Sequence, residues 1–415
     1  MRLNGAEIIV KLLERQGIAT IAGIPGGANL PLYNALYKSP IRHILARHEQ
    51  GAGFIAHGMA RSTGRPAVCF ATSGPGATNL ITAIADARLD SVPLIAITGQ
   101  VPTSMLGTDA FQEVDIYNMT IPITKHNFLV RSAAELLSVI PEAFEIALSG
   151  RPGPVLIDVP KDVQTQEIDV YGWPEIGERL PSPPIDTDAI ARAAAMINEA
   201  KRPVLYAGGG VMNSASHAVL REIADKNSIP VALTLMGLGC FPPDNPLYLG
   251  MLGMHASPYT NLLLDEADLL IAVGARFDDR AVGRVQEFCP EAAIVHIDID
   301  RAELDKIRKA HISIACDAGE ALSALLPLVR IDERREWRSR LALLREEHPF
   351  PAPRDGSQHP LSIIAGIAAA APEDAIITTD VGQHQMWVAQ GYPFTRPRTL
   401  LTSGGLGTMG FGLPA

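Results

Sequence analysis

The sequence predicts an α/β protein built from doubly wound parallel sheets, and three observations support that fold class. Short runs rich in β-branched residues alternate with helical patterns along most of the chain. Glycine or proline follows many of these runs directly, where the backbone must turn tightly or approach a ligand closely. The chain has 415 residues, of which 47% are hydrophobic, and this length exceeds what a single core usually supports. We therefore expect two or three domains.

The first predicted unit, residues 1–165, contains six short strands separated by helical patterns. The strands are expected at residues 20–24, 41–46, 67–72, 93–98, 128–131 and 155–159. Such alternation favours parallel pairing with helices on both faces of the sheet. Residues 166–187, which include a proline-rich stretch at 174–184, are expected to form a linker.

The second predicted unit, residues 188–330, repeats the same pattern. Its strands are expected at 203–207, 230–235, 269–273, 293–297 and 313–315, with helices that include 215–226 and 302–310. A second linker is predicted at 331–358; a charged helical connector at 332–347 precedes a polar, proline-containing stretch at 349–360.

Residues 359–415 begin a third unit, with a helix expected at 361–371, a strand at 375–379 and a glycine-rich ending. One strand and one turn cannot close a core. We therefore expect this third domain to be incomplete in the sequence.

Charge and composition exclude several classes of function. The net charge of −10 argues against nucleic acid or an anionic membrane surface as a partner, because both require clustered Lys and Arg. The apolar runs are too short to span a bilayer, and no signal peptide is evident. Four isolated cysteines fit a reducing compartment and do not have zinc-site spacing: Cys69, Cys240, Cys289 and Cys316. The expected location is the cytoplasm.

Glu49 is the first candidate for chemistry, because the predicted strand at 41–46 places its carboxylate at the carboxyl edge of the sheet. Ligands bind along that edge in open α/β sheets. Three segments strengthen the expectation, since each places glycine or proline after an apolar run: residues 23–27, 71–79 and 98–102. The alternative is that Glu49 only complements the dipole of the following helix.

In the second unit, the glycine triplet at 208–210 follows a strand and precedes a helix. This arrangement brings free backbone N–H groups toward a phosphate, although a tight turn explains triple glycine about as well. Arg276 and Arg280 flank another strand end, where forked donors could bind phosphate or carboxylate. The alternative for these arginines is a surface network with the neighbouring aspartates.

Other polar residues have two readings each. Asp298 ends a strand where a ribose hydroxyl is often bound, but it or Asp300 could cap the helix expected at 302–310. Arg151 in a stiff loop and Lys161 after a strand could bind ligands or be solvated charges.

Gln112 is expected to begin or lie in a helix after a loop, where its amide could enter a cleft or lie on a solvated face. His384 beside Gln383 invites a catalytic assignment. No G-x-S-x-G nucleophile motif accompanies it, so a hydrolase is not expected.

Taken together, these segments closely resemble the catalytic subunit of acetohydroxyacid synthase, also called acetolactate synthase. The resemblance runs nearly end to end and is carried by residues 47–52, 73–79, 107–112, 125–126, 151–154, 251–255, 274–280, 379–386 and 402–414. It implies a pyrimidine-binding domain at 1–165, a central FAD-binding domain at 188–330 and the start of a diphosphate-binding domain at 359–415. All three would have the doubly wound fold of thiamine diphosphate (ThDP) enzymes.

The resemblance also implies the reaction. Such an enzyme decarboxylates pyruvate with ThDP and Mg²⁺ and condenses the product with pyruvate or 2-ketobutyrate, giving 2-acetolactate or 2-aceto-2-hydroxybutyrate. This is the first common step of branched-chain amino-acid biosynthesis. The family's G-D-G…N-N signature, which holds Mg²⁺, does not occur before Ala415. No metal ligand is therefore assigned within the sequence, and a chain of these residues alone is expected to be inactive.

Site residues follow from the resemblance position by position. Glu49 would hydrogen-bond the pyrimidine ring of ThDP. The other ThDP residues would be Thr72, Pro75, Asn79, Gln112, Gly382, Gln383, His384, Gly407 and Met409. Glu49 and Gln112 would act in catalysis together with Lys161 and Arg280, of which Arg280 would bind the second ketoacid's carboxylate. A structural FAD would be held by Arg151, Gly208, Gly209, Gly210, Thr234, Leu252, Met254, His255, Arg276, Asp298 and Asp317, with Met254 also lining the substrate channel.

The resemblance further implies a homodimer, with each active site at the interface, and a small regulatory subunit. Two alternatives stay open at this point. One is another flavin-containing ThDP enzyme, such as a pyruvate oxidase or a glyoxylate carboligase, the latter lacking the equivalent of Glu49. The other is a non-catalytic FAD-binding remnant.

Overall fold

The computed structural model describes residues 1–350 and 359–415, which form two compact units. The first unit comprises Met1–Pro181 together with Leu401–Ala415, and the second comprises Ser182–Leu400. Of the polar stretch predicted at 349–360, residues 351–358 lie outside the described residues. No helix in the described ranges is long and apolar enough to cross a membrane.

A six-stranded, all-parallel sheet forms the centre of the first unit. Its strands lie in the order β3-β2-β4-β5-β7-β6. They are β2 (Thr20–Gly23), β3 (Arg42–Leu45), β4 (Ala67–Ala71), β5 (Leu94–Gln100), β6 (His126–Leu129) and β7 (Val155–Pro160). All six predicted strands are therefore present. The order reverses direction between β2 and β4, and such a switch point opens a crevice at the carboxyl ends of the strands.

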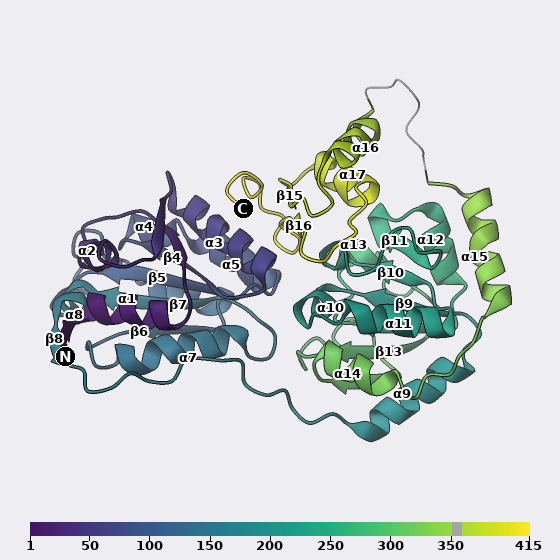
Figure 1. The fold of residues 1–415 in the computed structure, drawn as a ribbon, viewed down its shortest axis with the longest axis horizontal. Coiled ribbons are helices and arrows are strands. Elements are labelled where there is room, and N and C mark those ends of the chain that lie inside the picture. The colour runs from purple at the N-terminus through teal and green to yellow at the C-terminus, as the bar shows by residue number, and fades with distance from the viewer. Residues whose placement is uncertain (351–358) are drawn as a thin grey trace. The chain divides into compact units, whose positions relative to one another are not determined.

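Helices cover both faces of this sheet (Figure 1). One face packs on α1 (Gly5–Arg15), α2 (Leu30–Leu36) and α7 (Leu136–Leu148), and the other on α3 (Glu49–Thr63) and α5 (Ile81–Leu89). The alternation along β4 shows why: Val68 and Phe70 belong to the first core cluster, whereas Cys69 belongs to the second. A strand buried on both faces reads as a continuous apolar run, which is why β4 was predictable.

Shorter elements complete the first unit. These are α4 (Pro75–Thr78), α6 (Ile116–Thr120), α8 (Lys161–Thr165), the 3₁₀ turns η1 (Thr103–Met105) and η2 (Ile121–Ile123), and an antiparallel pair of β1 (Arg2–Asn4) and β8 (Glu167–Asp169). The β1–β8 pair was not predicted. A capping box fixes the start of α1, since Asn4 accepts from the Glu7 N–H and Glu7 accepts from the Asn4 N–H.

The second unit contains another six-stranded parallel sheet, in the order β11-β10-β9-β12-β13-β14. Its strands are β9 (Pro203–Ala207), β10 (Val231–Leu233), β11 (Tyr248–Met251), β12 (Leu269–Val273), β13 (Ala293–Asp298) and β14 (Ile312–Ala315). Five of these strands were predicted, and β11 was not. Here the switch point lies between β9 and β12.

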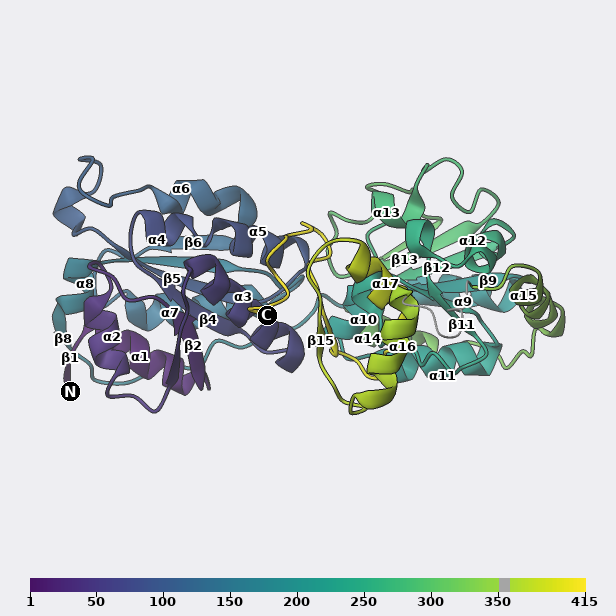
Figure 2. The ribbon, with the colours of Figure 1, turned by 90° about the horizontal axis from the view of Figure 1, so that it is seen from above.

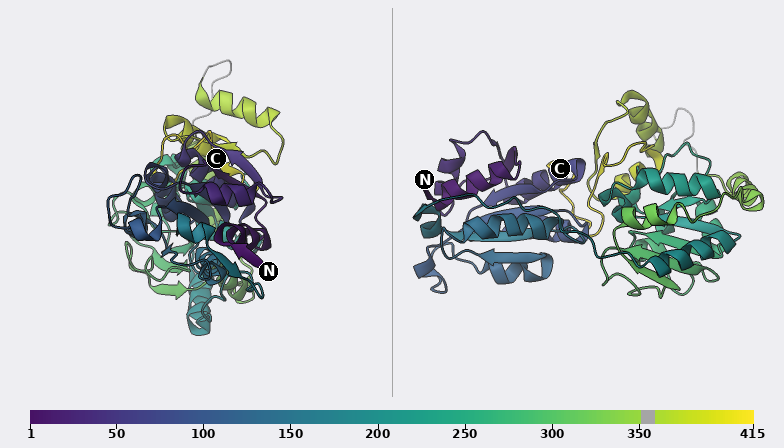
Figure 3. Two further views of the ribbon diagram at one scale, coloured as in Figure 1. Left: turned by 90° about the vertical axis from the view of Figure 1, so that its left-hand side faces the viewer. Right: turned by 60° about the horizontal axis from the view of Figure 1, so that its bottom comes forward.

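Helices again lie on both faces, with α12 (Pro258–Asp265) and α13 (Asp279–Val282) on one side and α11 (His217–Asn227) and α14 (Ala318–Leu325) on the other (Figure 2). The remaining helices are α9 (Thr187–Glu199), α10 (Gly209–Asn213), α15 (Arg335–Glu347) and the 3₁₀ turns η3 (Leu235–Gly237) and η4 (Gly253–His255). Figure 3 (right) shows the strands of this unit between its helices. Both sheets thus confirm the predicted doubly wound α/β class.

The helix predicted at 302–310 is wrong, because turns occupy this segment. Aspartates there bond nearby backbone and compete with helix formation. Asp298 accepts from the Asp300 N–H, and Asp300 accepts from the Ala302 N–H. Asp305 has a φ of +60°, which a helix interior does not allow. Asp298 and Asp300 therefore do not cap a helix at this place.

The third segment contains α16 (Pro360–Ala370), α17 (Gln383–Gly391) and a small sheet of β15 (Ile377–Thr378) and β16 (Leu400–Leu401). The predicted helix and strand are thus present. Residues up to Leu400 belong to the second unit and Leu401–Ala415 to the first. The division into three domains with the boundaries given above stays a prediction.

Candidate functional site

The turns after β2, β3 and β4 meet at the switch point of the first sheet, and Glu49 lies there as the first residue of α3. Its neighbour His48 caps the helix, with Nδ1 accepting from the Gln50 N–H at 3.1 Å. After β4, Gly74 adopts a φ of +58° and Pro75 opens α4. These turns bring the starts of α3 and α4 together, so Glu49 and Pro75, which are 26 positions apart, lie at one site.

Glu49 is hydrogen-bonded within this site. The Asn79 side-chain amide donates to Glu49 Oε2 at 2.9 Å. The other carboxylate oxygen, Oε1, lies 3.2 Å from where a Cβ would stand on Gly76, so glycine leaves room for the carboxylate. Oε1 makes no hydrogen bond to any residue of the described ranges. One oxygen is thereby oriented by the protein, and the other is available to a ligand.

Thr72 lies between the turn that follows β2 and the turn that follows β4. Its hydroxyl accepts from the Ala28 N–H at 3.3 Å, and a Cβ on Gly26 or Gly76 would come within 2.7 Å of its side chain. Gly26 and Gly76, which were predicted to allow close approach, therefore make room for the Thr72 side chain. Gly76 also makes room for the Glu49 carboxylate.

Gln112 reaches this site from a loop, so its predicted position in a helix is wrong. It has a φ of +60°, uncommon for a residue with a Cβ, and its Cα lies 2.9 Å from where a Cβ would stand on Gly74. Glu113 holds the loop by accepting from the backbone N–H groups of Gly107, Thr108 and Ala110. These bonds lower the pKa of the Glu113 carboxyl. Backbone strain of this kind is frequent at functional sites.

The remaining candidates of the first unit lie elsewhere along it. Lys161 opens α8 directly after β7 and is exposed. Arg151 Nε donates to Ser91 Oγ at 2.8 Å, and its Nη2 donates to the Leu89 carbonyl at 3.3 Å. Arg151 is thus held at the end of α5, and its contact with a flavin stays a prediction.

A buried carboxyl that sequence reasoning missed lies beside a cavity in the same unit. Thr98 Oγ1 and Gln100 Nε2 donate to the two oxygens of Asp158, at 2.7 and 2.9 Å. Burial raises the Asp158 pKa to about 7, against the lowering effect of these hydrogen bonds. The cavity, about 900 Å³, is also lined by Tyr117, His126, Arg131 and others. The only sign of this buried carboxyl in the sequence is that Asp158 stands within an otherwise apolar predicted strand.

At the switch point of the second sheet, the glycine turns after β9 and β12 contact each other. A Cβ on Gly208 would lie 2.2 Å from the Gly274 carbonyl oxygen, and one on Gly210 would lie 2.5 Å from the Gly274 Cα. Gly208 and Gly210 also donate their N–H groups to the Val273 and Gly274 carbonyls. Backbone packing therefore accounts for two glycines of the triplet, while Gly209 begins α10 at this edge.

Two polar groups at this edge have no partner among the described residues. The Thr234 hydroxyl, at the end of β10, is buried without a hydrogen bond. The half-buried Arg276 makes no hydrogen bond or ion pair within the parts of the chain that the structure describes. A buried orphan hydroxyl and a free guanidinium beside a helix N-terminus fit a phosphate-containing ligand.

Other predicted flavin residues surround this edge. Asp298 ends β13. Asp317 caps α14 by accepting from the Gly319 N–H at 2.8 Å. Leu252 is buried in the core cluster that faces α12 and α15. Capping and packing explain Asp317 and Leu252 without a ligand, and their flavin contacts stay predictions.

Arg280, Met254 and His255 lie together in the second unit. Arg280 Nη1 is 3.9 Å from the Met254 sulfur, and Nε is 3.7 Å from an Asp279 oxygen. Burial lowers the pKa of His255, and the Arg280 charge lowers it further. Since the Arg280 and Asp279 side chains are 69% and 85% exposed, their ion pair is weak and leaves the guanidinium accessible.

The third segment contributes residues to both units. Gly382, with a φ of +153°, precedes Gln383 and His384 at the start of α17 in the second unit. Gly407, with a φ of +70°, and Met409, which is 74% exposed, belong to the first unit.

Comparisons with known proteins agree with this architecture. Residues 3–119 match the thiamine pyrophosphate enzyme N-terminal TPP binding domain, residues 190–325 match the central domain, and residues 380–415 match the C-terminal TPP binding domain. Thiamine pyrophosphate (TPP) is another name for ThDP.

Similar proteins share the whole chain. Acetolactate synthase isozyme 1 large subunit of Escherichia coli K12 is 60% identical over all of this chain, which covers 74% of that protein. The isozyme 2 large subunit is 48% identical over all of this chain, which covers 75% of it. The chloroplastic acetolactate synthase of Arabidopsis thaliana is 48% identical over 99% of this chain, which covers 63% of it. The chain belongs to the acetolactate synthase large-subunit family of thiamine pyrophosphate enzymes.

Proposed function

We propose that the chain is the catalytic subunit of an acetolactate synthase, which decarboxylates pyruvate and condenses the product with a second 2-ketoacid, pyruvate or 2-ketobutyrate. The observation that carries this proposal is the Glu49–Asn79 pair at the switch point of the first sheet. It supports the reading because one carboxylate oxygen is oriented by the protein while the other is accessible, as a proton-exchanging group requires. The pathway would be branched-chain amino-acid biosynthesis, and the location the cytoplasm.

The residues around Glu49 fit ThDP. Thr72, Pro75 and Asn79 would line the pocket for its pyrimidine ring, and Gly407 and Met409 would contact that ring from the third segment. Gly382, Gln383 and His384 would approach the diphosphate. When bound, ThDP would supply the nucleophilic carbon and the electron sink that pyruvate decarboxylation needs. Glu49 would hold a proton at Oε1 and exchange it with the ring nitrogen.

Other side chains would bind and orient the substrates. Arg280 would grip the carboxylate of the second ketoacid with its forked donors. Met254 would line the same channel, since it lies against Arg280. Gln112 would present its amide beside the Glu49 site, and Lys161 would line the approach. Excluding water around these groups would strengthen every charge interaction with the substrate.

A structural FAD would bind at the switch point of the second sheet. The orphan hydroxyl of Thr234 and the unpaired Arg276 support this assignment. Gly209, Gly210, His255, Asp298 and the other predicted residues would complete the site. Mg²⁺ would also be required, with ligands other than the residues assigned here. We further propose a homodimer with active sites at its interface and a small regulatory subunit as a partner.

A chimera tests the proposal, in which the remaining quarter of the E. coli isozyme 1 large subunit follows Ala415. With pyruvate, ThDP, Mg²⁺ and FAD, we expect acetolactate, detected as acetoin after acid decarboxylation, without oxygen uptake. Pyruvate-dependent oxygen uptake without acetolactate would instead identify an oxidase. Retained flavin with neither product would identify a non-catalytic FAD-binding protein.

Two substitutions sharpen the test. Glu49→Gln should abolish acetolactate formation while flavin binding persists. Arg280→Lys should raise the KM of the second ketoacid, because an ammonium lacks the guanidinium fork. Arg284→Lys is the matched control, since Arg284 is exposed and pairs with Glu287 on the surface. Equal KM values for the two lysine variants would contradict the role given to Arg280.

A further inference from the structure

A buried polar cluster on α3 and α5 holds the segment Thr402–Phe411, a contact that the cofactor site does not explain. Both helices and the segment belong to the first unit, and the end of the chain runs beside α3 in Figures 1 and 2. The clamp, as we call it, consists of Arg61 on α3 and Asp90 at the end of α5, with Asp86 of α5 close to Asp90.

Asp90 is the centre of the clamp. Its two oxygens accept from the backbone N–H groups of Gly404 at 2.9 Å and Gly405 at 2.7 Å. Arg61 Nη1 lies 3.2 Å from the same carboxylate and donates to the Thr402 carbonyl at 2.5 Å. The Asp90 side chain is fully buried and that of Arg61 is 11% exposed, so these charged bonds are shielded from water.

Apolar contacts hold the other end of the segment. Phe411 is fully buried, and its ring centroid lies 5.1 Å from both Phe54 and His57 in edge-to-face geometry. Glycines permit this approach, because a Cβ on Gly58 would meet Ala415 at 2.7 Å and one on Gly405 would meet Leu89 at 2.8 Å. The segment is therefore fixed at both ends, with Gly407 and Met409 between them.

The cluster includes groups that could bind a metal, since His57, Asp86 and Asp90 offer ligand atoms within 4.8 Å of one another. Arg61 and two backbone donors already occupy Asp90. Burial lowers the pKa of His57 well below its usual value, so this ring carries no charge. Burial also raises the pKa of Asp86 to about 6. Neither Asp86 oxygen and neither His57 ring nitrogen has a hydrogen-bond partner among the described residues. Of the three groups, Asp90 is therefore the one that the chain segment occupies.

The same helix carries Glu49 and Arg61. They stand twelve residues apart on α3, roughly 18 Å along its axis. A rigid helix therefore links the proposed cofactor carboxylate to the group that holds the segment.

We propose that Arg61 and Asp90 are positioning residues that fix Gly407 and Met409 for the cofactor; the cofactor part of this inference rests on the proposed function. Neither residue touches the reacting atoms. Their effect passes through the backbone of residues 402–405, which sets where Gly407 begins its left-handed turn. Loosening the clamp leaves the residues around Glu49 in place but makes Gly407 and Met409 mobile.

The first test needs no enzymatic activity. Hydrogen exchange is measured in the 415-residue chain for amides 402–411, comparing Asp90→Ala with Asp169→Asn, an exposed carboxylate of the same unit. Asp90→Ala should speed exchange of the Gly404 and Gly405 amides by about tenfold or more, since each loses a charged acceptor. Asp169→Asn should change nothing. Unchanged exchange in Asp90→Ala refutes the clamp, whatever reaction the protein catalyses.

The second test uses the chimera and separates positioning from folding. Arg61→Met should weaken ThDP binding by about tenfold while flavin content stays constant, and Arg61→Lys, which keeps a positive charge beside the buried Asp90, should restore much of the binding. Faster exchange with unchanged ThDP affinity would overturn the positioning role and leave only a structural contact. A chimera without synthase activity that still shows both effects would sink the proposed reaction but support the clamp.

Discussion

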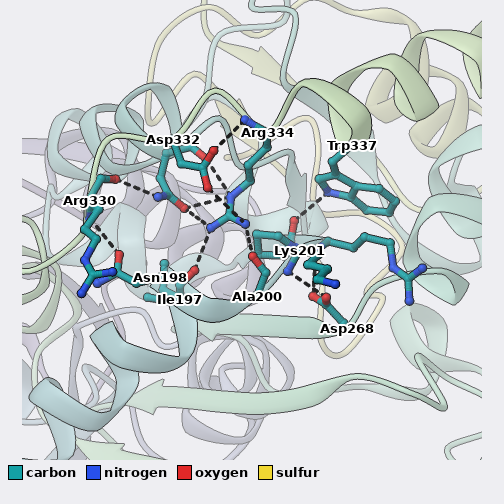
Figure 4. A network of polar contacts seen from close by, with 12 residues as sticks. Ile197, Asn198, Ala200, Lys201, Asp268, Arg330, Asp332, Arg334 and Trp337 are labelled. Atoms are coloured by element: carbon teal, nitrogen blue, oxygen red, sulfur yellow. Dashed lines mark hydrogen bonds and ion pairs between the residues drawn. The ribbon is translucent and has the colours of Figure 1, made fainter.

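The substitution Arg334→Met should strongly destabilise the second unit. Arg334 precedes α15 in a left-handed conformation, with φ at +39°, and its side chain is 2% exposed. The guanidinium donates to three backbone carbonyls from three places in the sequence, those of Ile197, Ala200 and Asn227 (Figure 4). It also donates to the Asn227 side-chain oxygen at 2.6 Å. Arg334 therefore ties α9, α11 and the connector together.

The magnitude follows from what methionine leaves behind. Its side chain fills most of the volume of the arginine stem, so little packing is lost. Three carbonyl oxygens and one amide oxygen would lose a buried charged donor. Hydrogen bonds to charged groups contribute about 1.5–3 kcal/mol each and are not additive. Removing one partner of a buried charged network costs about 3–5 kcal/mol. We expect a loss in that range, a large part of a domain's stability.

Fluorescence of Trp337 provides the assay. This indole is buried three residues after Arg334 and donates to the Pro203 carbonyl at 3.0 Å, so it reports on the same junction. Urea unfolding would be followed after Trp173→Phe and Trp387→Phe leave Trp337 as the single tryptophan. Arg330→Met is the matched control, because Arg330 lies exposed just before Arg334, and within the described ranges only its backbone is hydrogen-bonded, to the Asn198 and Asn227 side chains.

Two outcomes decide the matter. A loss of several kcal/mol for Arg334→Met with less than about 0.5 kcal/mol for Arg330→Met agrees with the network. A loss below about 1 kcal/mol for Arg334→Met would refute it, because that much is expected from removing any partly ordered side chain.

Three further predictions use other features. The folded pKa of Asp158, raised to about 7, means that its stabilising effect is complete below about pH 4 and is lost as the pH rises through 7, so Asp158→Asn should flatten the urea stability profile between about pH 4 and 7. Parallel profiles would contradict this. Gly208→Ala should cost about 1–3 kcal/mol in urea unfolding because its Cβ would meet Gly274, whereas Gly172→Ala, which meets nothing within 4 Å, should cost little. All four cysteines are buried with pKa values raised to about 12, so a thiol reagent at pH 8 should label them only after denaturation.

Strands were predictable where both faces of a sheet are buried, since a run such as residues 67–71 is apolar throughout. Strands at the edge of a sheet and very short strands were harder to predict. β11 contains a glycine and pairs on one side only, and β1 and β8 are three residues each. The helix expected at 302–310 failed because aspartate side chains bonded the local backbone there instead.

The Glu49 site could be foreseen because parallel strands of one sheet end at the same edge, and the strands before Glu49 and Asn79 flank β2 there. The contact between the clamp and the segment Thr402–Phe411 could not be foreseen. Asp90 and Gly404 are 314 residues apart, and no local pattern announces a contact over that distance. Asp158 was missed for a different reason, because the apolar residues around it predict a strand and give no sign that its carboxyl is buried.

The two switch points use glycine in different ways, and this difference bears on what each site can do. In the first unit, Gly26 and Gly76 make room for the side chains of Thr72 and Glu49, so side chains line the crevice. In the second unit, Gly208 and Gly210 meet the backbone of Gly274 and donate their N–H groups to the Val273 and Gly274 carbonyls, so backbone packing brings helix and strand termini together. The groups left for a ligand at this edge are side chains, the Thr234 hydroxyl and the Arg276 guanidinium. One fold repeated twice thus uses glycine to admit side chains at one switch point and to pack backbone at the other.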